Sequence, residues 1–96
     1  MYAVYFENQR GIICPIGAGK DYRICMAIID EFLREHKFKS YYKQFTNIEV
    51  SNGKLRGKMT CVDVGSHVEF FYIKPAMDLS LNGDKKWFVF ITIIVK

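Results

Sequence analysis

The chain has 96 residues, of which 50% are hydrophobic, 25% charged and 16% aromatic, and its formal net charge is +4. This length predicts one domain over residues 1–96, and the balance of apolar and charged residues excludes an intrinsically disordered chain. The positive charge suits a nucleic acid or an acidic protein as a partner, but it is too small to indicate a basic tail.

Short segments rich in glycine and asparagine separate the apolar stretches along the whole chain. They lie at 8–11 (NQRG), 17–19 (GAG), 52–53 (NG), 65–66 (GS) and 82–83 (NG). Turn residues between apolar or alternating segments are typical of consecutive β-hairpins. The first of these turns predicts a hairpin in the N-terminal twenty residues.

The segment CPIGAGKD, residues 14–21, has some features of a phosphate-binding loop. Cys14 occupies the place of the first glycine of that motif, and Asp21 the place of its serine or threonine, so the motif is incomplete. We therefore interpret Gly17 and Gly19 as a turn into a helix, whose first N–H groups and Lys20 would offer only a weak anion site.

Apolar residues recur at helical spacing from Tyr22 to about Lys37 and predict one amphipathic helix. These residues are Cys25, Ile28, Ile29, Phe32 and Leu33. Asp21 is the expected N-cap, and the basic residues Lys37 and Lys39 suit the negative end of the helix dipole.

The segment KFKSYYK, residues 37–43, alternates lysines with aromatic rings and is called the basic-aromatic segment below. Its members are Lys37, Phe38, Lys39, Tyr41, Tyr42 and Lys43. Lysines that neutralise phosphates beside rings that stack on bases are typical of single-stranded nucleic-acid binding, and Arg56 and Lys58 would extend such a patch. The alternative is a helix end whose rings pack on the sheet while its lysines stay in water.

The next segments predict a β-meander. A two-residue turn at Asn52-Gly53 pairs Glu49 with Arg56, and a turn at Gly65-Ser66 places Cys61 opposite Phe70. One face then carries Ile48, Val50, Leu55, Met59, Cys61, Val68, Phe70 and Tyr72. The opposite face carries Glu49, Arg56, Lys58, Thr60, Val62, His67, Glu69, Phe71 and Ile73.

The last expected hairpin turns at 82–83 and ends with WFVFITIIV, residues 87–95. The predicted fold is therefore α+β, an antiparallel sheet of about six strands in the order ββ-α-ββββ with one helix packed on one face. One helix covers only one face, whereas residues 87–95 are apolar on both sides. We therefore expect a homodimer or another partner on the second face, the alternative being a sheet that curls into a half-barrel. The residues expected on that dimer or partner face are Phe71, Ile73, Phe88, Phe90 and Ile94.

The cysteines and histidines indicate neither a disulfide framework nor a metal site. Cys14, Cys25 and Cys61 form no CxxC pair, and the N-terminal segment lacks the apolar region of a signal peptide, so we expect a cytoplasmic protein. His36 and His67 have no second ligand at a recognised spacing. We therefore expect no metal, no cofactor and no membrane segment.

These observations favour a small non-enzymatic binding protein that acts by occupying a macromolecular partner, as adaptors and inhibitors do. A protein is the expected partner. The first alternative is an RNA- or single-stranded-DNA-binding protein that uses the basic-aromatic segment with Arg56 and Lys58. The second is a cofactor-free ribonuclease in which His67 and Glu69 act as acid and base, with Arg56 and Lys58 as the phosphate clamp.

Overall fold

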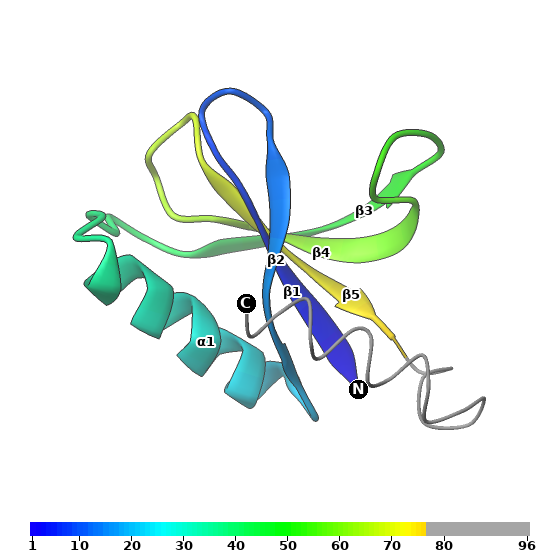
Figure 1. Ribbon diagram of the computed structural model, residues 1–96, viewed down its shortest axis with the longest axis horizontal. Helices are drawn as coiled ribbons and strands as arrows, with labels where there is room; N and C mark the ends of the chain where they lie inside the picture. The colour runs from blue at the N-terminus through cyan, green and yellow to red at the C-terminus, as the bar shows by residue number, and fades with distance from the viewer. Residues whose placement is uncertain (77–96) are drawn as a thin grey trace.

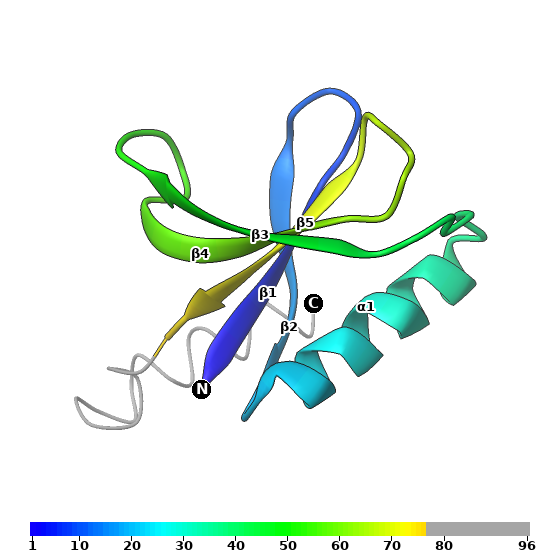
Figure 2. The same cartoon turned by 180° about the vertical axis from the view of Figure 1, so that it is seen from behind.

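A computed structural model of the protein describes residues 1–76 and shows an α+β fold (Figures 1 and 2). The elements are β1 (Tyr2–Glu7), β2 (Ile13–Gly19), α1 (Tyr22–Glu35), β3 (Gln44–Val50), β4 (Gly57–Asp63) and β5 (Phe70–Pro75). The five strands form an antiparallel sheet in the order β2-β1-β5-β4-β3. The α+β class is thus confirmed. The expected hairpin at 77–95, with Phe88, Phe90 and Ile94, lies outside the described residues.

Helix α1 forms where the apolar spacing predicts it. The side chain of Asp21 accepts the Ile24 N–H at 3.0 Å, which confirms the expected N-cap. Cys25, Ile29 and Leu33 are buried on the face that meets the sheet. The other end stops at Glu35, two residues before the expected end.

Gly17 and Gly19 lie within strand β2, so their interpretation as a turn into the helix is wrong. A Cβ atom on Gly17 would lie 2.9 Å from the Cγ2 atom of Ile28, and one on Gly19 would lie 2.8 Å from the Cγ2 atom of Ile24. Such separations are too short for carbon atoms that are not bonded. The two glycines therefore let α1 approach the strand closely.

The core lies between α1 and the face of the sheet that carries Val62, Phe71 and Ile73, all three of them fully buried. Phe71 and Ile73 were expected on the surface for a partner, and this expectation is wrong because the helix covers them. β5 is apolar on both faces, so its pattern alone could not show which face the helix takes.

The strand registers differ from the expected ones by two residues. Glu49 pairs with Lys58 instead of Arg56, and Cys61 pairs with Tyr72 instead of Phe70. The connection between β3 and β4 is a six-residue loop, 51–56, instead of a two-residue turn. A shift of two residues preserves the alternation of faces, so the residues of β3, β4 and β5 that were expected to share a face still do so. Leu55, Arg56, His67, Val68 and Glu69 were expected on those strands but lie in the loops 51–56 and 64–69.

Candidate functional site

The basic-aromatic segment leaves the helix through a sharp turn at Lys37, whose φ of 58° is left-handed. The Lys37 N–H donates to the Arg34 carbonyl at 3.2 Å, and the Phe38 N–H donates to the Leu33 carbonyl at 2.9 Å. These two bonds form the Schellman arrangement that ends many helices. The Phe38 ring then packs near Phe6, with ring centroids 5.8 Å apart. The turn therefore draws one ring inward and leaves Lys37 in solvent.

The two tyrosines of this segment are held against the loop 64–69 that joins β4 to β5. The Tyr41 N–H donates to the Val64 carbonyl at 3.0 Å. Gly65 has a φ of +93°, and a Cβ atom on it would lie only 3.0 Å from the Tyr42 ring. A glycine is therefore needed there both for its backbone conformation and for the contact with Tyr42.

The loop 64–69 is itself ordered by its own side chains. The Asp63 carboxylate accepts the Gly65 N–H at 2.9 Å. The Ser66 hydroxyl accepts the Glu69 N–H at 2.9 Å and donates to the Glu69 carbonyl at 3.2 Å. Short local bonds of this kind fix a loop without secondary structure. The loop 64–69, which faces the two tyrosines, is therefore ordered by its own hydrogen bonds.

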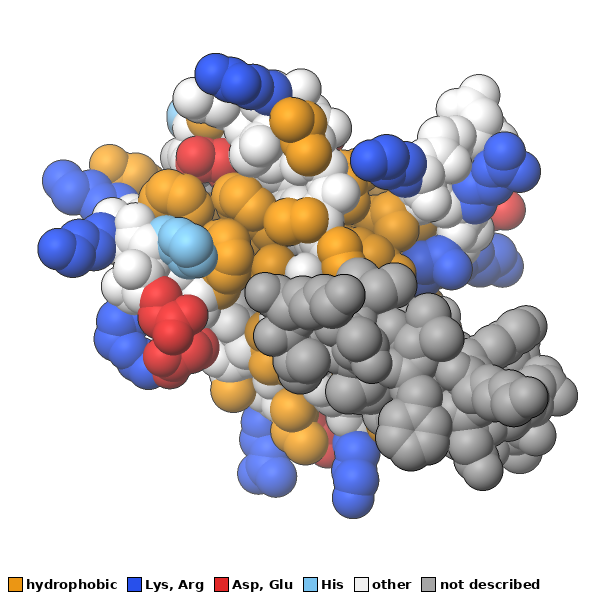
Figure 3. Space-filling model, in the orientation of Figure 1, with side chains coloured by type: hydrophobic (Ala, Val, Ile, Leu, Met, Phe, Trp, Pro, Cys, Tyr) orange, Lys and Arg blue, Asp and Glu red, His pale blue; other side chains and the backbone are white. Residues whose placement is uncertain are grey.

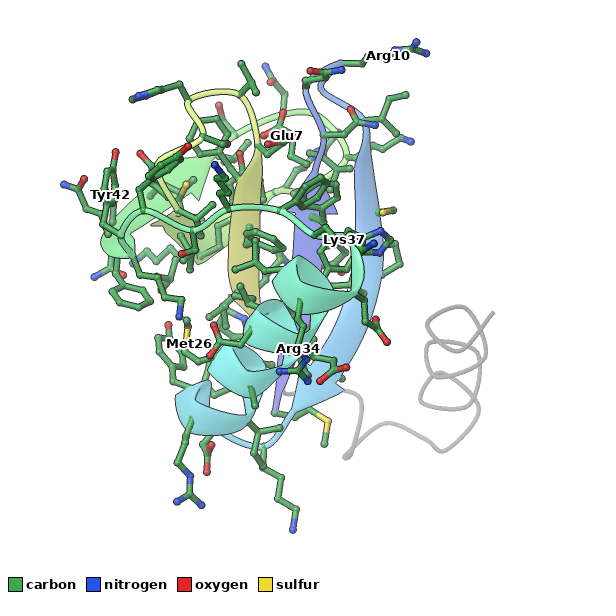
Figure 4. The ribbon with its side chains drawn as sticks, turned by 90° about the vertical axis from the view of Figure 1, so that its left-hand side faces the viewer. Glu7, Arg10, Met26, Arg34, Lys37 and Tyr42 are labelled. Atoms are coloured by element: carbon green, nitrogen blue, oxygen red, sulfur yellow. The ribbon has the colours of Figure 1, made fainter. Side chains whose placement is uncertain are left out.

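An open groove of about 580 Å³ lies between the two segments, and we call it the tyrosine groove. It is lined by Phe38, Lys39, Tyr41, Tyr42, Gly65, Ser66, His67 and Glu69. The exposed fraction is 68% for Tyr41 and 46% for Tyr42, which is high for large apolar side chains. Figure 4 shows Tyr42 at the margin of the molecule, well away from Lys37.

The lysines of the basic-aromatic segment do not form one patch. Lys39 lines the tyrosine groove, and Lys37 is exposed at the helix end. Lys43 instead forms an ion pair with Asp30 of α1. On the face in Figure 3, Lys and Arg side chains are spread around the rim, with apolar side chains between them. The lysine positions therefore match the alternative in which this segment is a helix end.

Arg56 and Lys58 lie apart from the tyrosine groove, at the other end of β4. Arg56 is in the loop 51–56, and Lys58 pairs with Glu49 near the start of the strand. Strand β4 runs from residue 57 to residue 63, which is about 20 Å at 3.4 Å per residue. Arg56 and Lys58 were expected to extend the basic-aromatic segment. This expectation is wrong, because the length of β4 separates them from it.

The ribonuclease hypothesis placed His67 and Glu69 on one face of a strand beside Arg56 and Lys58. In the structure both residues lie in the loop 64–69 and line the tyrosine groove, without the expected phosphate clamp. In the described part of the chain, no hydrogen bond or ion pair joins His67 to Glu69. A general acid and base need a partner within hydrogen-bond reach of the reacting group. The groove thus contains suitable residue types for acid–base chemistry without an assembled catalytic arrangement.

The face of the sheet opposite the helix carries a row of polar groups that sequence reasoning missed. The Tyr72 hydroxyl donates a short hydrogen bond to the Glu7 carboxylate, across the β1–β5 pair. Burial, followed by that hydrogen bond, raises the pKa of Tyr72 well above its usual value. Burial, followed by the charges of Asp63 and Glu7, also raises the pKa of the neighbouring Cys61 thiol. A thiol that keeps its proton is a poor nucleophile, so the raised pKa disfavours Cys61 as a reactive group.

Comparison of the chain with protein-family models, with curated proteins and with solved structures finds no match in any of the three. Within residues 1–76, the helix is too short and too polar to cross a membrane. The same residues contain no cluster of three or more histidine, cysteine or acidic side chains arranged to hold a metal ion.

Proposed function

We propose that this protein is a non-enzymatic binding protein, of the adaptor or inhibitor kind, that acts as a homodimer and occupies a protein partner through the tyrosine groove. The observation that carries the proposal is the pair of adjacent, solvent-exposed rings of Tyr41 and Tyr42 beside that groove. Tyrosine is enriched among the residues that dominate protein interfaces, because its ring buries much area and its hydroxyl still finds a partner.

The backbone around the two rings supports the same proposal. Tyr41 is fixed by its bond to Val64, and Gly65 lies directly under the Tyr42 ring. A binding surface that is already ordered loses less conformational entropy when a partner docks. The groove edge also offers one cation and one anion, Lys39 and Glu69, so a partner with mixed charge would fit it.

A nucleic acid is the second candidate partner, because Lys39 lines the groove beside the two tyrosines and Lys37 is exposed at the helix end. It is less well supported than a protein partner. Proteins that bind single-stranded nucleic acid normally have a continuous run of cations along the path of the phosphates. Here Lys43 is paired with Asp30, and Arg56 is at the far end of β4, so the run is interrupted. Glu69 on the groove would also repel phosphates.

The proposal is tested by affinity capture from the source cells with three immobilised baits, and the captured material is identified by mass spectrometry. The baits are the unchanged protein, the double variant Y41S/Y42S and the control Ile12→Ser. Ile12 has an exposed fraction of 53% and does not line the groove. We expect one dominant polypeptide on the first and third baits and a loss of at least tenfold on Y41S/Y42S. Equal capture on all three baits would refute the proposal.

A separate arm tests the nucleic-acid candidate with a fluorescent single-stranded RNA of random sequence. The variant K37E/K39E is compared with K20E/R23E, which makes the same charge change at the other end of α1. A nucleic-acid site at the groove predicts that K37E/K39E alone abolishes binding, and that the affinity falls steeply between about 50 and 200 mM salt. Equal effects of the two variants indicate attraction by net charge only. Cleavage of the RNA, lost in His67→Ala, would support the ribonuclease.

A further inference from the structure

The sheet has two edge strands in the described residues, β2 and β3, and they differ in how they resist pairing with another chain (Figures 1 and 2). β2 carries Pro15, which has no N–H to donate, and its register with β1 shifts opposite Val4 and Tyr5. Prolines and bulges are two of the devices that keep an edge strand from pairing with another chain. Helix α1 also packs against β2. This edge is therefore protected.

The β3 edge has none of these devices. Its seven residues, QFTNIEV, contain no proline, glycine or lysine, and Glu49 is the only charge. The register with β4 runs without a shift from Gln44 opposite Asp63 to Val50 opposite Gly57. Five of its seven side chains are exposed. A regular, nearly uncharged edge of this length is a template for another strand.

We infer that β3 pairs with β3 of a second copy of this chain, antiparallel and centred on Ile48, to form one continuous sheet. The inference rests on the homodimer of the proposed function and identifies its surface. An antiparallel pair related by two-fold symmetry places the same surface of both copies in contact, so the strand must be compatible with its own reversed sequence.

The β3 sequence satisfies this condition in the register centred on Ile48. On one face, Thr46 lies opposite the partner's Val50 and Ile48 opposite the partner's Ile48, which are favourable pairs of β-branched residues. On the other face, the Asn47 amide lies opposite the partner's Glu49 and can donate to its carboxylate.

The neighbouring registers are less favourable. A pair centred on Glu49 would oppose two carboxylates, and one centred on Asn47 would place Glu49 opposite the ring of the partner's Phe45. Like charges directly opposite one another destabilise a strand pair. The register centred on Ile48 avoids both unfavourable pairs and gives each Glu49 carboxylate an amide donor, so it is the favoured one.

The first test measures the mass in solution by light scattering. The chain has a mass of 11.2 kDa, so we expect about twice that value for the unchanged protein. The variant T46K/I48K adds two charges to the β3 edge and should run as a monomer. Its control is I13K/C14K on β2, where one side chain is half-buried and the other exposed, as on β3. The control should remain a dimer, and far-UV circular dichroism checks that both variants are folded.

The second test reads the register by oxidative cross-linking in a Cys14→Ser background. Residues directly opposite in an antiparallel pair have Cα atoms about 4.5–5.5 Å apart, which a disulfide can span. Ile48→Cys should therefore form a covalent dimer. Val50→Cys should not, since its counterpart would lie four residues away along the strand.

A monomer for the unchanged protein, or a dimer that persists in T46K/I48K, would overturn the inference. Neither result touches the capture experiment, which depends on Tyr41 and Tyr42. Conversely, Y41S/Y42S should keep the dimer mass. The proposal that the tyrosine groove binds a partner and the inference that β3 forms the dimer are therefore tested separately.

Discussion

Substitution of Gly17 by alanine tests how closely α1 packs on β2. The new methyl group would lie 2.9 and 3.0 Å from two carbon atoms of Ile28, so the helix or that side chain must move. Overpacking of this kind costs about 1–3 kcal/mol. The φ of Gly17 is not left-handed, so alanine fits the backbone there and regains about 0.4–1 kcal/mol through the unfolded state. We therefore expect a net loss of about 1–2 kcal/mol, or a fall in melting temperature of roughly 5–15 °C.

The assay is urea denaturation followed by circular dichroism, arranged as a double-mutant cycle. Gly17→Ala in an Ile28→Ala background should cost at least 1 kcal/mol less than it does alone, because the methyl group then finds room. Gly53→Ala is the matched control. Its Cβ would meet no atom within 4 Å, but its φ of +100° strains any side chain, so Ile28→Ala should not change its cost. If Gly17→Ala is neutral or stabilising, or if the two substitutions simply add, the close packing of α1 on β2 is refuted.

Three further predictions follow from the described contacts. Phe71→Ala should lower the free energy of unfolding in urea by about 3–5 kcal/mol because the ring is fully buried; a loss under about 1 kcal/mol would place it on the surface instead. Asp21→Ala removes the acceptor of the Ile24 N–H and should cost about 1 kcal/mol in thermal unfolding, whereas Asp21→Asn should cost little. The raised pKa of Tyr72 predicts a loss of stability at alkaline pH, because the unfolded chain releases this proton near pH 10 while the folded chain keeps it. The contribution of Tyr72 to the free energy of unfolding is therefore complete below pH 10 and is lost as the pH rises toward the folded pKa. Tyr72→Phe should reduce that loss between about pH 9 and 11. An unchanged pH profile would contradict the raised pKa that burial, followed by the hydrogen bond to Glu7, gives this hydroxyl.

The helix could be predicted from the sequence because its signals are local. Cys25, Ile29 and Leu33 follow the helical period, and Asp21 is a common cap residue in the position where it caps. The α+β class followed from the same kind of signal. Periodicity and capping depend on neighbours within a few residues, and tertiary contacts rarely override them in a strongly amphipathic segment.

The registers could not be predicted because a turn signal reports only its own neighbourhood. The Asn52-Gly53 pair favours a two-residue turn, yet the buried side chain of Leu55 and the left-handed Gly57 extend the connection to six residues. The sequence also could not show which face of the sheet the helix covers, since residues 70–73 are apolar on both faces of β5. The two faces differ only in that α1 packs against one of them.

Only one of the two segments that line the tyrosine groove could be predicted from the sequence. The exposed rings of Tyr41 and Tyr42 belong to the segment that composition singled out, but its second wall comes from the loop 64–69. No local spacing rule connects Tyr41 to Val64, because their hydrogen bond lies just beyond the end of the β3–β4 pair, where Gln44 is opposite Asp63, and depends on that pairing. Lys39 and Arg56 are separated for a simpler reason. Lys39 precedes β3 and Arg56 precedes β4, and two antiparallel strands begin at opposite ends of their pair.

The interior position of β1, between β2 and β5, has a consequence for synthesis on the ribosome. Its partner β5 is made about 63 residues after Glu7, which takes roughly 3–13 seconds at ribosomal rates of 5–20 residues per second. Until then, the nascent chain holds the hairpin and the helix with one side of β1 unpaired and Val4 and Phe6 without their later neighbours. This interval is when chaperones would matter most, and when an arrested or truncated chain would be most prone to aggregate.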